Sequence, residues 1–295
     1  MLPLNKHTIQ LIECPRDAMQ GWSHAIATVD KIRYLNSLLK VGFHSLDFGS
    51  FVSPKAIPQM ADTALVLAGL DQSLLKKNRL LVIVANLRGA ATAMTYPAIQ
   101  YIGFPFSLSP TFQLRNTNSS MEQSLETVRQ IQLLCQVHNK ELVLYLSMGF
   151  GNPYGDDYHA AMLLDWTERL VEMGIGIISV ADTVGMASPI QINTAIANLV
   201  PRFPETVIGV HLHSSQTNFQ DKLQAAIDGG CIRFDGAIKG IGGCPMAQDQ
   251  LVGNMDTIAI INYLKSRGMD PQLDEMALSE AIIIADQIFD PNLNA

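Results

Sequence analysis

The fold of this chain is decided by a stretch that reads Val207-Ile208-Gly209-Val210-His211-Leu212-His213. Its β-branched residues predict a buried strand over residues 207–211, which runs into two histidines separated by one residue. Because side chains alternate between the two faces of a strand, both imidazoles leave the same face and could bind a single metal ion. Such a pair can also be plain polar surface at a strand end. Whether it is a metal site therefore depends on whether further ligands lie at matching positions.

On either side of this stretch, short apolar runs alternate with longer amphipathic segments. We predict strands at 8–14, 45–47, 80–85, 98–104, 142–147, 176–180, 207–211 and 232–236. Apolar residues at three- and four-residue spacing predict helices at 28–41, 60–70, 88–94, 124–138, 157–173, 189–199 and 218–228, with two more at 257–267 and 274–290. This alternation indicates an α/β fold, a single (β/α)8 TIM barrel with extra C-terminal helices, and we expect one domain over residues 1–295.

The composition of the 295-residue chain fits a large soluble domain, with 48% hydrophobic and 16% charged residues. The net charge of −7, without clusters of lysine or arginine, argues against nucleic acid or an anionic membrane surface as a partner. The first residues do not resemble a signal or transit peptide, and no apolar run approaches the ~20 residues that span a bilayer, so we expect a cytoplasmic protein. The four cysteines, Cys14, Cys135, Cys231 and Cys244, lack CxxC spacing, which indicates neither a disulfide framework nor a zinc knuckle.

Polar residues follow the predicted strands at their carboxyl ends, where a TIM barrel places its active site. They are Asp17, Asp47, Asn86, Asp182, Thr183, His211 and His213, and a glycine-rich loop at 240–247 follows the last strand. Asp17 would lie near the His-x-His strand in a closed barrel, although an Arg-Asp pair can also be a surface turn. Two imidazoles and a carboxylate suit a divalent cation such as Mg²⁺ or Mn²⁺. Asn254 could add a neutral oxygen, or Gly253-Asn254 could simply be a turn.

Several motifs, in this order along the chain, carry a family resemblance. They are Ile12-Glu13-Cys14-Pro15-Arg16-Asp17, Ser50-Phe51-Val52-Ser53-Pro54-Lys55, Pro58-Gln59-Met60, Ala181-Asp182-Thr183-Val184-Gly185, His211-Leu212-His213, Gly242-Gly243-Cys244-Pro245 and Gly253-Asn254. Over residues 8–285 the chain resembles 3-hydroxy-3-methylglutaryl-CoA (HMG-CoA) lyases. More broadly, it is similar to the TIM-barrel metallolyases that include 2-isopropylmalate and homocitrate synthases and 4-hydroxy-2-oxovalerate aldolase.

The resemblance implies a divalent-metal-dependent carbon–carbon lyase that converts HMG-CoA, an acyl-CoA of leucine degradation, to acetyl-CoA and acetoacetate, and it implies a homodimer. The implied metal ligands are Asp17, His211, His213 and Asn254. The implied catalytic residues are Arg16, which contacts the substrate carbonyl and the enolate, Cys244 of the glycine-rich loop, Asp47, Asp182 and His211, with Arg16, Gln20, Asn86 and Thr183 binding substrate. The reaction removes a hydroxyl proton, stabilises an enolate and protonates its carbon, for which a metal ion, a guanidinium and a thiol are suited.

Some residues depart from the lyase pattern. Ala18 replaces a glycine, which would alter the turn if φ is positive there, and Asp47 replaces a glutamate. Asn152 stands where a cysteine is usual, and Ser214-Ser215 stand where Asp-Thr or Asn-Thr is usual. These departures bear on the details of the substrate and leave the expected ligand set intact.

Alternatives stay open from the sequence. The same barrel could be an aldolase or condensing enzyme that acts on a 2-oxo acid, or a catalytically inactive barrel that serves as a binding subunit. Cys244 could be a small packing thiol. Ser120 with Gln123 has the spacing of a capping box, so we expect Ser120 to cap a helix instead of binding a ligand.

Overall fold

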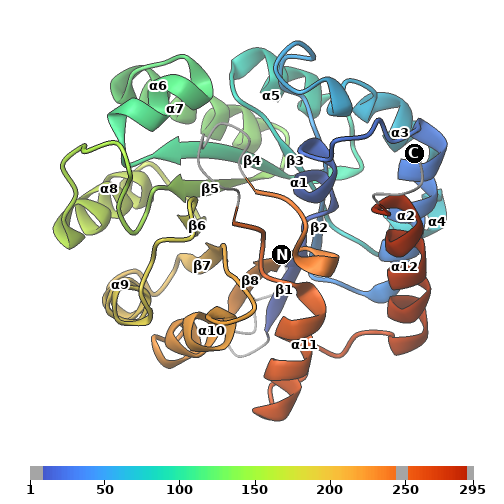
Figure 1. Cartoon of the computed structure of the whole chain (residues 1–295). Helices are drawn as coiled ribbons and strands as arrows, with labels where there is room; N and C mark the ends of the chain where they lie inside the picture. Colours follow the sequence, from blue (N-terminus) through green and yellow to red (C-terminus); the bar gives the residue numbers. More distant parts are fainter. Residues whose placement is uncertain (1–8, 244–251, 291–295) are drawn as a thin grey trace.

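The computed structural model describes residues 9–243 and 252–290. Within these residues, eight parallel strands close into a barrel in sequence order (Figure 1). The strands are β1 (Gln10–Glu13), β2 (Ser45–Ser50), β3 (Leu80–Ile83), β4 (Ile99–Ser107), β5 (Glu141–Ser147), β6 (Ile177–Asp182), β7 (Val207–Leu212) and β8 (Arg233–Gly236). Gln10 of β1 pairs with Arg233 of β8, which closes the barrel. The predicted TIM barrel is therefore confirmed.

Helices surround the barrel and cover the outer face of its strands (Figure 1). In chain order they are α1 (Pro15–Gln20), α2 (Thr28–Val41), η1 (Pro58–Met60), α3 (Thr63–Gly69), α4 (Gln72–Leu75), α5 (Leu87–Met94), α6 (Pro110–Thr117), α7 (Met121–Val137), α8 (Ala160–Glu172), α9 (Pro189–Arg202), α10 (Phe219–Asp228), η2 (Ile238–Gly240), α11 (Thr257–Ser266) and α12 (Glu275–Ile288). Buried aliphatic and aromatic side chains form one continuous core between these two layers. Among the described residues, no helix is both long and apolar enough to cross a membrane.

The barrel interior is divided between apolar and polar side chains. Leu81, Tyr101, Val143, Tyr145 and Ile177 form a cluster separate from the main core, on the opposite face of their strands. This cluster fills part of the barrel as side-chain layers do in other TIM barrels. The functional residues must therefore lie above it, at the carboxyl ends of the strands.

The last helix packs beside the first long helix. α12 lies along α2 (Figure 1), and the backbone N–H of Asp274 donates to the carbonyl oxygen of Val41 (2.9 Å). Phe289 packs edge-on against Trp22 and Tyr34, with ring centroids 5.3 and 5.9 Å apart. The two predicted C-terminal helices are confirmed as α11 and α12, and they cover the barrel wall between β8 and β2.

Local capping explains where the helices begin. Ser120 and Gln123 form the expected capping box, so α7 starts at Met121, ahead of the predicted start at residue 124. Helix α6 was not predicted, although the Ser109 hydroxyl caps it and Pro110 occupies its first position. The helix predicted at 60–70 is divided into η1 and α3. The weak helix predicted at 88–94 is confirmed as α5.

Pro15, Arg16 and Asp17 follow β1 directly and form the first turn of helix α1, which was not predicted. A proline at this position suits a helix start, because its missing N–H would have no partner within the helix. Ala18 lies in the same helix and is buried, so its backbone is helical and φ is not positive. The replacement of a glycine by Ala18 therefore does not strain the backbone next to Asp17.

Candidate metal and substrate site

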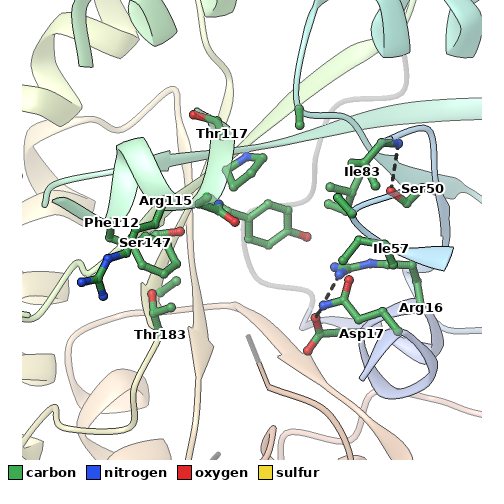
Figure 2. A pocket seen from close by; sticks show the side chains of 18 of the residues that line it. Arg16, Asp17, Ser50, Ile57, Ile83, Phe112, Arg115, Thr117, Ser147 and Thr183 are labelled. Atoms are coloured by element: carbon green, nitrogen blue, oxygen red, sulfur yellow. Dashed lines mark hydrogen bonds and ion pairs between the residues drawn. The ribbon is translucent and has the colours of Figure 1, made fainter. Parts of the chain in front are cut away.

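A cavity of about 400 Å³ opens at the carboxyl ends of the strands, with walls from α1, α6 and several strand ends (Figure 2). Many of the predicted site residues line it, namely Arg16, Asp17, Gln20, Asn86, Thr183, His211 and His213. Asp47, Asp182 and Asn254 are buried behind these residues. Cys244 lies outside the described residues.

Three ligand-bearing side chains converge on one wall of the cavity. One ligand atom each of Asp17, His211 and His213 lies within 4.8 Å of the others. The two imidazoles come from the end of β7, where alternation places them on one face, and Asp17 comes from α1. Asn254 forms an isolated antiparallel bridge with His213, and its amide nitrogen donates to Asp17 Oδ2 (2.7 Å). A carboxylate and two imidazoles with an amide beside them fit a divalent ion.

The glycine-rich loop comes so close to these ligands that Gly242 has no room for a side chain. A Cβ at Gly242 would lie 2.4 Å from the Asn254 amide nitrogen and 3.0 Å from Asp17 Oδ2. Gly242 also has a φ of +113°, a backbone conformation that other residues rarely adopt. Glycine at this position therefore lets the loop backbone lie directly against the ligands.

The charges around Asp17 and His213 keep both groups in the form that binds metal ions. Burial by itself raises the pKa of Asp17, but the charges of Arg16 and His211 and the hydrogen bond from Asn254 lower it to about 2. Burial and the neighbouring His211 lower the pKa of His213 to about 3. At neutral pH Asp17 is therefore a carboxylate and His213 a neutral imidazole, as ligation requires.

Asp235 of β8 orients His211. The distance between His211 Nδ1 and Asp235 Oδ2 is 3.1 Å, and Asp235 is buried. Burial lowers the pKa of His211, but the hydrogen bond and the charge of Asp235 outweigh it, and the pKa is raised. With Nδ1 directed at Asp235, Nε2 is the nitrogen that can ligate a metal ion. Asp235 was not predicted as a site residue, although it occupies the same strand-end position on β8 that His211 occupies on β7.

Arg16 lies between two carboxylates at the edge of the cavity. Its Nε and Nη2 donate to Asp47 Oδ2 (3.0 and 2.5 Å), and its Nη1 donates to Asp17 Oδ1 (2.9 Å). Asp47 is fully buried, and burial raises its pKa to about 6 although Arg16 opposes this shift. Asp47 thus holds Arg16 in place, and the shorter aspartate side chain reaches the guanidinium. Gln20 Nε2 also donates to Asp17 Oδ1 (2.7 Å).

Asp182 does not face the cavity. Its Oδ2 accepts from Lys222 Nζ (2.7 Å) in an ion pair buried on both sides, and its Oδ1 accepts from the N–H of Ala187 (3.0 Å). Lys222 Nζ also donates to the carbonyl oxygens of His213 and Gly185, both at 2.9 Å. Lys222, which was not predicted as a site residue, lies on the buried face of α10. Lys222 lies three residues after Phe219, the first residue of α10. In an amphipathic helix this spacing places both residues on the same face, which could have indicated that Lys222 is buried.

Asn86 and Thr183 use their side-chain oxygens within the protein. Asn86 Oδ1 accepts from the N–H of Gly89 and caps α5, and Thr183 Oγ1 accepts from the N–H of Met148, both at 2.9 Å. Both residues still line the cavity. Tyr145, which the sequence analysis did not single out, lines it as well, and its ring meets His211 edge-on at 5.8 Å.

The chain is similar to proteins of one family over almost its whole length. The HMGL-like family model matches residues 9–283. Hydroxymethylglutaryl-CoA lyase YngG of Bacillus subtilis is 33% identical over 278 residues, which cover 94% of this chain and 92% of that protein. The cytoplasmic 3-hydroxy-3-methylglutaryl-CoA lyase of Rattus norvegicus is 30% identical, over 92% of this chain and 79% of that protein.

Solved structures agree with these sequence matches. The HMG-CoA lyase of Bacillus subtilis has a TM-score of 0.88 at 31% identity, covering 98% of this chain and 97% of that one. An HMG-CoA lyase of Acinetobacter baumannii, in complex with coenzyme A and 3-methylmalate, has a TM-score of 0.88 at 28% identity, covering 97% and 92%. From the family model over residues 9–283 and the 33% identical relative, this chain belongs to the HMGL-like family and is a lyase.

Proposed function

We propose that this lyase cleaves HMG-CoA to acetyl-CoA and acetoacetate with the help of a divalent metal ion. The observation that carries the proposal is the convergence of Arg16 with Asp17, His211 and His213 on one cavity of an HMGL-like barrel. Relatives of 33% and 30% identity are named for this reaction, which supports the same substrate here.

Asp17, His211 and His213, with the amide oxygen of Asn254, would hold the metal ion. When bound, a divalent ion lowers the pKa of a substrate hydroxyl and fixes its orientation. Asn254 and Gln20 donate to different oxygens of Asp17, at 2.7 Å each, and so fix that carboxylate. Asp235 fixes the ring of His211 in the same way.

Arg16 is our candidate for stabilising the enolate that forms when the carbon–carbon bond breaks. It is permanently charged, and Asp47 holds two of its nitrogens, so its direction is set before substrate binds. Hydrogen-bond donors that are held in place before the reaction and aimed at developing charge are usually the largest single source of transition-state stabilisation in enzymes. Cys244 is proposed to protonate the enolate carbon, on the resemblance alone.

The cavity walls suit an acyl thioester. Ile57, Ile83 and Phe112 give apolar surface, and Arg115 of α6 is a charged residue on the same lining (Figure 2). Asn116 of α6 also lines the cavity. A volume of about 400 Å³ is at the lower end of small-molecule sites. The Acinetobacter baumannii relative was solved with coenzyme A, which supports a thioester as ligand here. The sequence and its family resemblance also predict that the protein is cytoplasmic, that it forms a homodimer and that it acts in leucine degradation. These three points remain predictions.

The test is to strip the full chain of metal with a chelator, add HMG-CoA with Mg²⁺ or Mn²⁺, and measure acetoacetate. We expect no product in the chelator, product with either ion, and loss of metal binding in Asp17→Ala. Asp62→Ala serves as the matched control, because Asp62 pairs with Lys31 away from the cavity. Full activity after chelation would contradict the metal assignment. Cleavage of a 4-hydroxy-2-oxo acid but not of HMG-CoA would indicate the aldolase alternative.

A further inference from the structure

A second group of potential metal ligands lies directly beside the first. One ligand atom each of Cys14, His211 and Asp235 lies within 4.8 Å of the others. Cys14 follows β1, and its backbone N–H donates to the carbonyl oxygen of Gly236 (2.8 Å), which fixes it against the end of β8. Cys14 and Asp235 are buried, with 1% and 3% of their surfaces exposed. This group contains a sulfur and no residue of the cavity wall except His211.

The spacing of the two harder donors already suits a metal ion. His211 Nδ1 and Asp235 Oδ2 lie 3.1 Å apart. In a tetrahedral site with metal–ligand bonds of about 2.0–2.1 Å, two such ligand atoms are about 3.3 Å apart. An ion between them would therefore need only a small outward shift of either side chain. His211 would offer Nδ1 to this site, whereas Nε2 faces the cavity.

The electrostatic surroundings of Cys14 favour a cation. Burial raises the pKa of the Cys14 thiol well above its usual range, and the charges of Asp235, Asp47 and Asp17 raise it further. The same carboxylates that oppose a bare thiolate would stabilise a divalent ion that replaces the thiol proton. Arg233 opposes this effect, but its Nη1 contacts Asp235 Oδ1 (3.4 Å) and leaves Oδ2 directed at His211.

We propose that Cys14, His211 and Asp235 form a second metal site, specific for thiophilic divalent ions such as Zn²⁺ and Cd²⁺. Thiolate and imidazole ligands select such ions over Mg²⁺ and Mn²⁺, which the Asp17 group suits better. Binding replaces the hydrogen bond between His211 and Asp235 with three bonds to the ion. The proton on Cys14 Sγ leaves to solvent, the remaining ring proton of His211 is carried on Nε2 instead of Nδ1, and no electron is transferred.

Occupation of this site inhibits the lyase. With an ion on Nδ1, the ring proton of His211 is on Nε2, and this nitrogen then cannot ligate a second ion beside Asp17 and His213. Its charge also opposes a second divalent ion on the other nitrogen of the same ring. This consequence, unlike the site itself, rests on the proposed function.

The test uses Cd²⁺ as the probe on the full, metal-stripped chain, because cadmium bound to thiolate gives an ultraviolet charge-transfer band and a characteristic cadmium NMR shift. We expect both signals in the unmodified protein, and their loss in Cys14→Ser with at least about tenfold weaker Cd²⁺ binding. Cys231→Ser is the matched control, since Cys231 is also buried near β7 and β8 but lies outside the ligand group. The Cys244→Ser variant tests whether the thiolate that binds Cd²⁺ comes from the glycine-rich loop instead of from Cys14.

A second variant keeps Cys14 and replaces the other three of the four cysteines, by Cys135→Ser, Cys231→Ser and Cys244→Ser. It tests whether Cys14 binds Cd²⁺ even if Cys14→Ser fails to fold. Retention of the cadmium–thiolate signals in this variant supports the proposal. Their absence there, or their survival in a folded Cys14→Ser variant, overturns it. Inhibition of HMG-CoA cleavage by Cd²⁺ is measured separately, on the unmodified chain. If that chain shows the Cys14 signals but cleaves no HMG-CoA with Mg²⁺ or Mn²⁺ in the absence of Cd²⁺, the proposed function is refuted and the second site stands.

Discussion

Replacing Lys222 by methionine tests the buried ion pair that fixes the end of β6 to the end of β7. Lys222 and Asp182 side chains are 2% and 1% exposed, and Lys222 Nζ makes three contacts of 2.7–2.9 Å. Lys222→Met removes one partner and leaves the Asp182 charge buried, which typically costs about 3–5 kcal/mol. This is a large fraction of the roughly 5–15 kcal/mol that stabilises a folded protein.

The measurement is urea unfolding followed by circular dichroism. We expect a clearly lower urea midpoint for Lys222→Met than for the unmodified protein. The midpoint should partly recover in Lys222→Met/Asp182→Asn, because the double variant has no buried carboxylate without an ion-pair partner at this position. Lys31→Met is the matched control: Lys31 pairs with Asp62, whose side chain is 19% exposed and can be hydrated when the lysine is lost. A Lys222→Met midpoint equal to that of Lys31→Met would refute the reasoning, as would a double variant less stable than the single one.

The same variants decide what Asp182 does. If Asp182 acts only through Lys222, Lys222→Met/Asp182→Asn keeps turnover per folded molecule within about tenfold of the unmodified protein, with weaker metal binding because the His213 carbonyl loses its donor. If Asp182 is catalytic, as the resemblance implies, Asp182→Asn alone lowers turnover by orders of magnitude while the chain stays folded.

Three further outcomes follow from the site and its surroundings. Burial raises the pKa of Glu13 from 4.5 to about 8, so between these pH values the folded state keeps a proton that the unfolded chain loses. The free energy of unfolding should therefore fall as the pH rises from 4.5 to about 8, by on the order of 1 kcal/mol per pH unit. The urea midpoint of Glu13→Gln should not show this pH dependence. Arg16→Lys keeps the charge but loses the two-nitrogen contact with Asp47, so kcat should fall at least about 100-fold, and a near-normal kcat would reduce Arg16 to a structural role. Cys244→Ser should lose most of its turnover yet bind metal and substrate, whereas normal turnover would make Cys244 a packing thiol.

Features set by local rules were predictable from the sequence. The alternation of a strand placed His211 and His213 on one face, and the closure of a parallel barrel brought Asp17 to them from the other end of the chain. The capping box of Ser120 and Gln123 is equally local and is confirmed. Each of these depends on a repeat or a motif that a few neighbouring residues carry.

Individual hydrogen bonds and ion pairs between side chains distant in sequence were not predictable. Asp182 follows a predicted strand and the resemblance implies a catalytic role for it, but its side chain points away from the cavity toward Lys222, forty positions later in the chain. Similarly, Asp235 takes the hydrogen-bonding nitrogen of His211 and so selects which nitrogen faces the cavity. One sequence shows that such residues are polar, whereas only the fold shows which of them meet.

The same pairings explain why the ligands are in place before an ion binds. Asp17 is held by Arg16, Gln20 and Asn254, and His211 is held by Asp235, so the ligand group does not depend on the ion for its shape. We therefore expect metal binding to be a local event, unlike that of small zinc domains, where it is coupled to folding. An incoming ion must compete with Arg16 and Asn254 for the oxygens of Asp17. A divalent ion gains more from that carboxylate than a monovalent one does, so we expect the competition with the Arg16 guanidinium and the Asn254 amide to favour divalent ions.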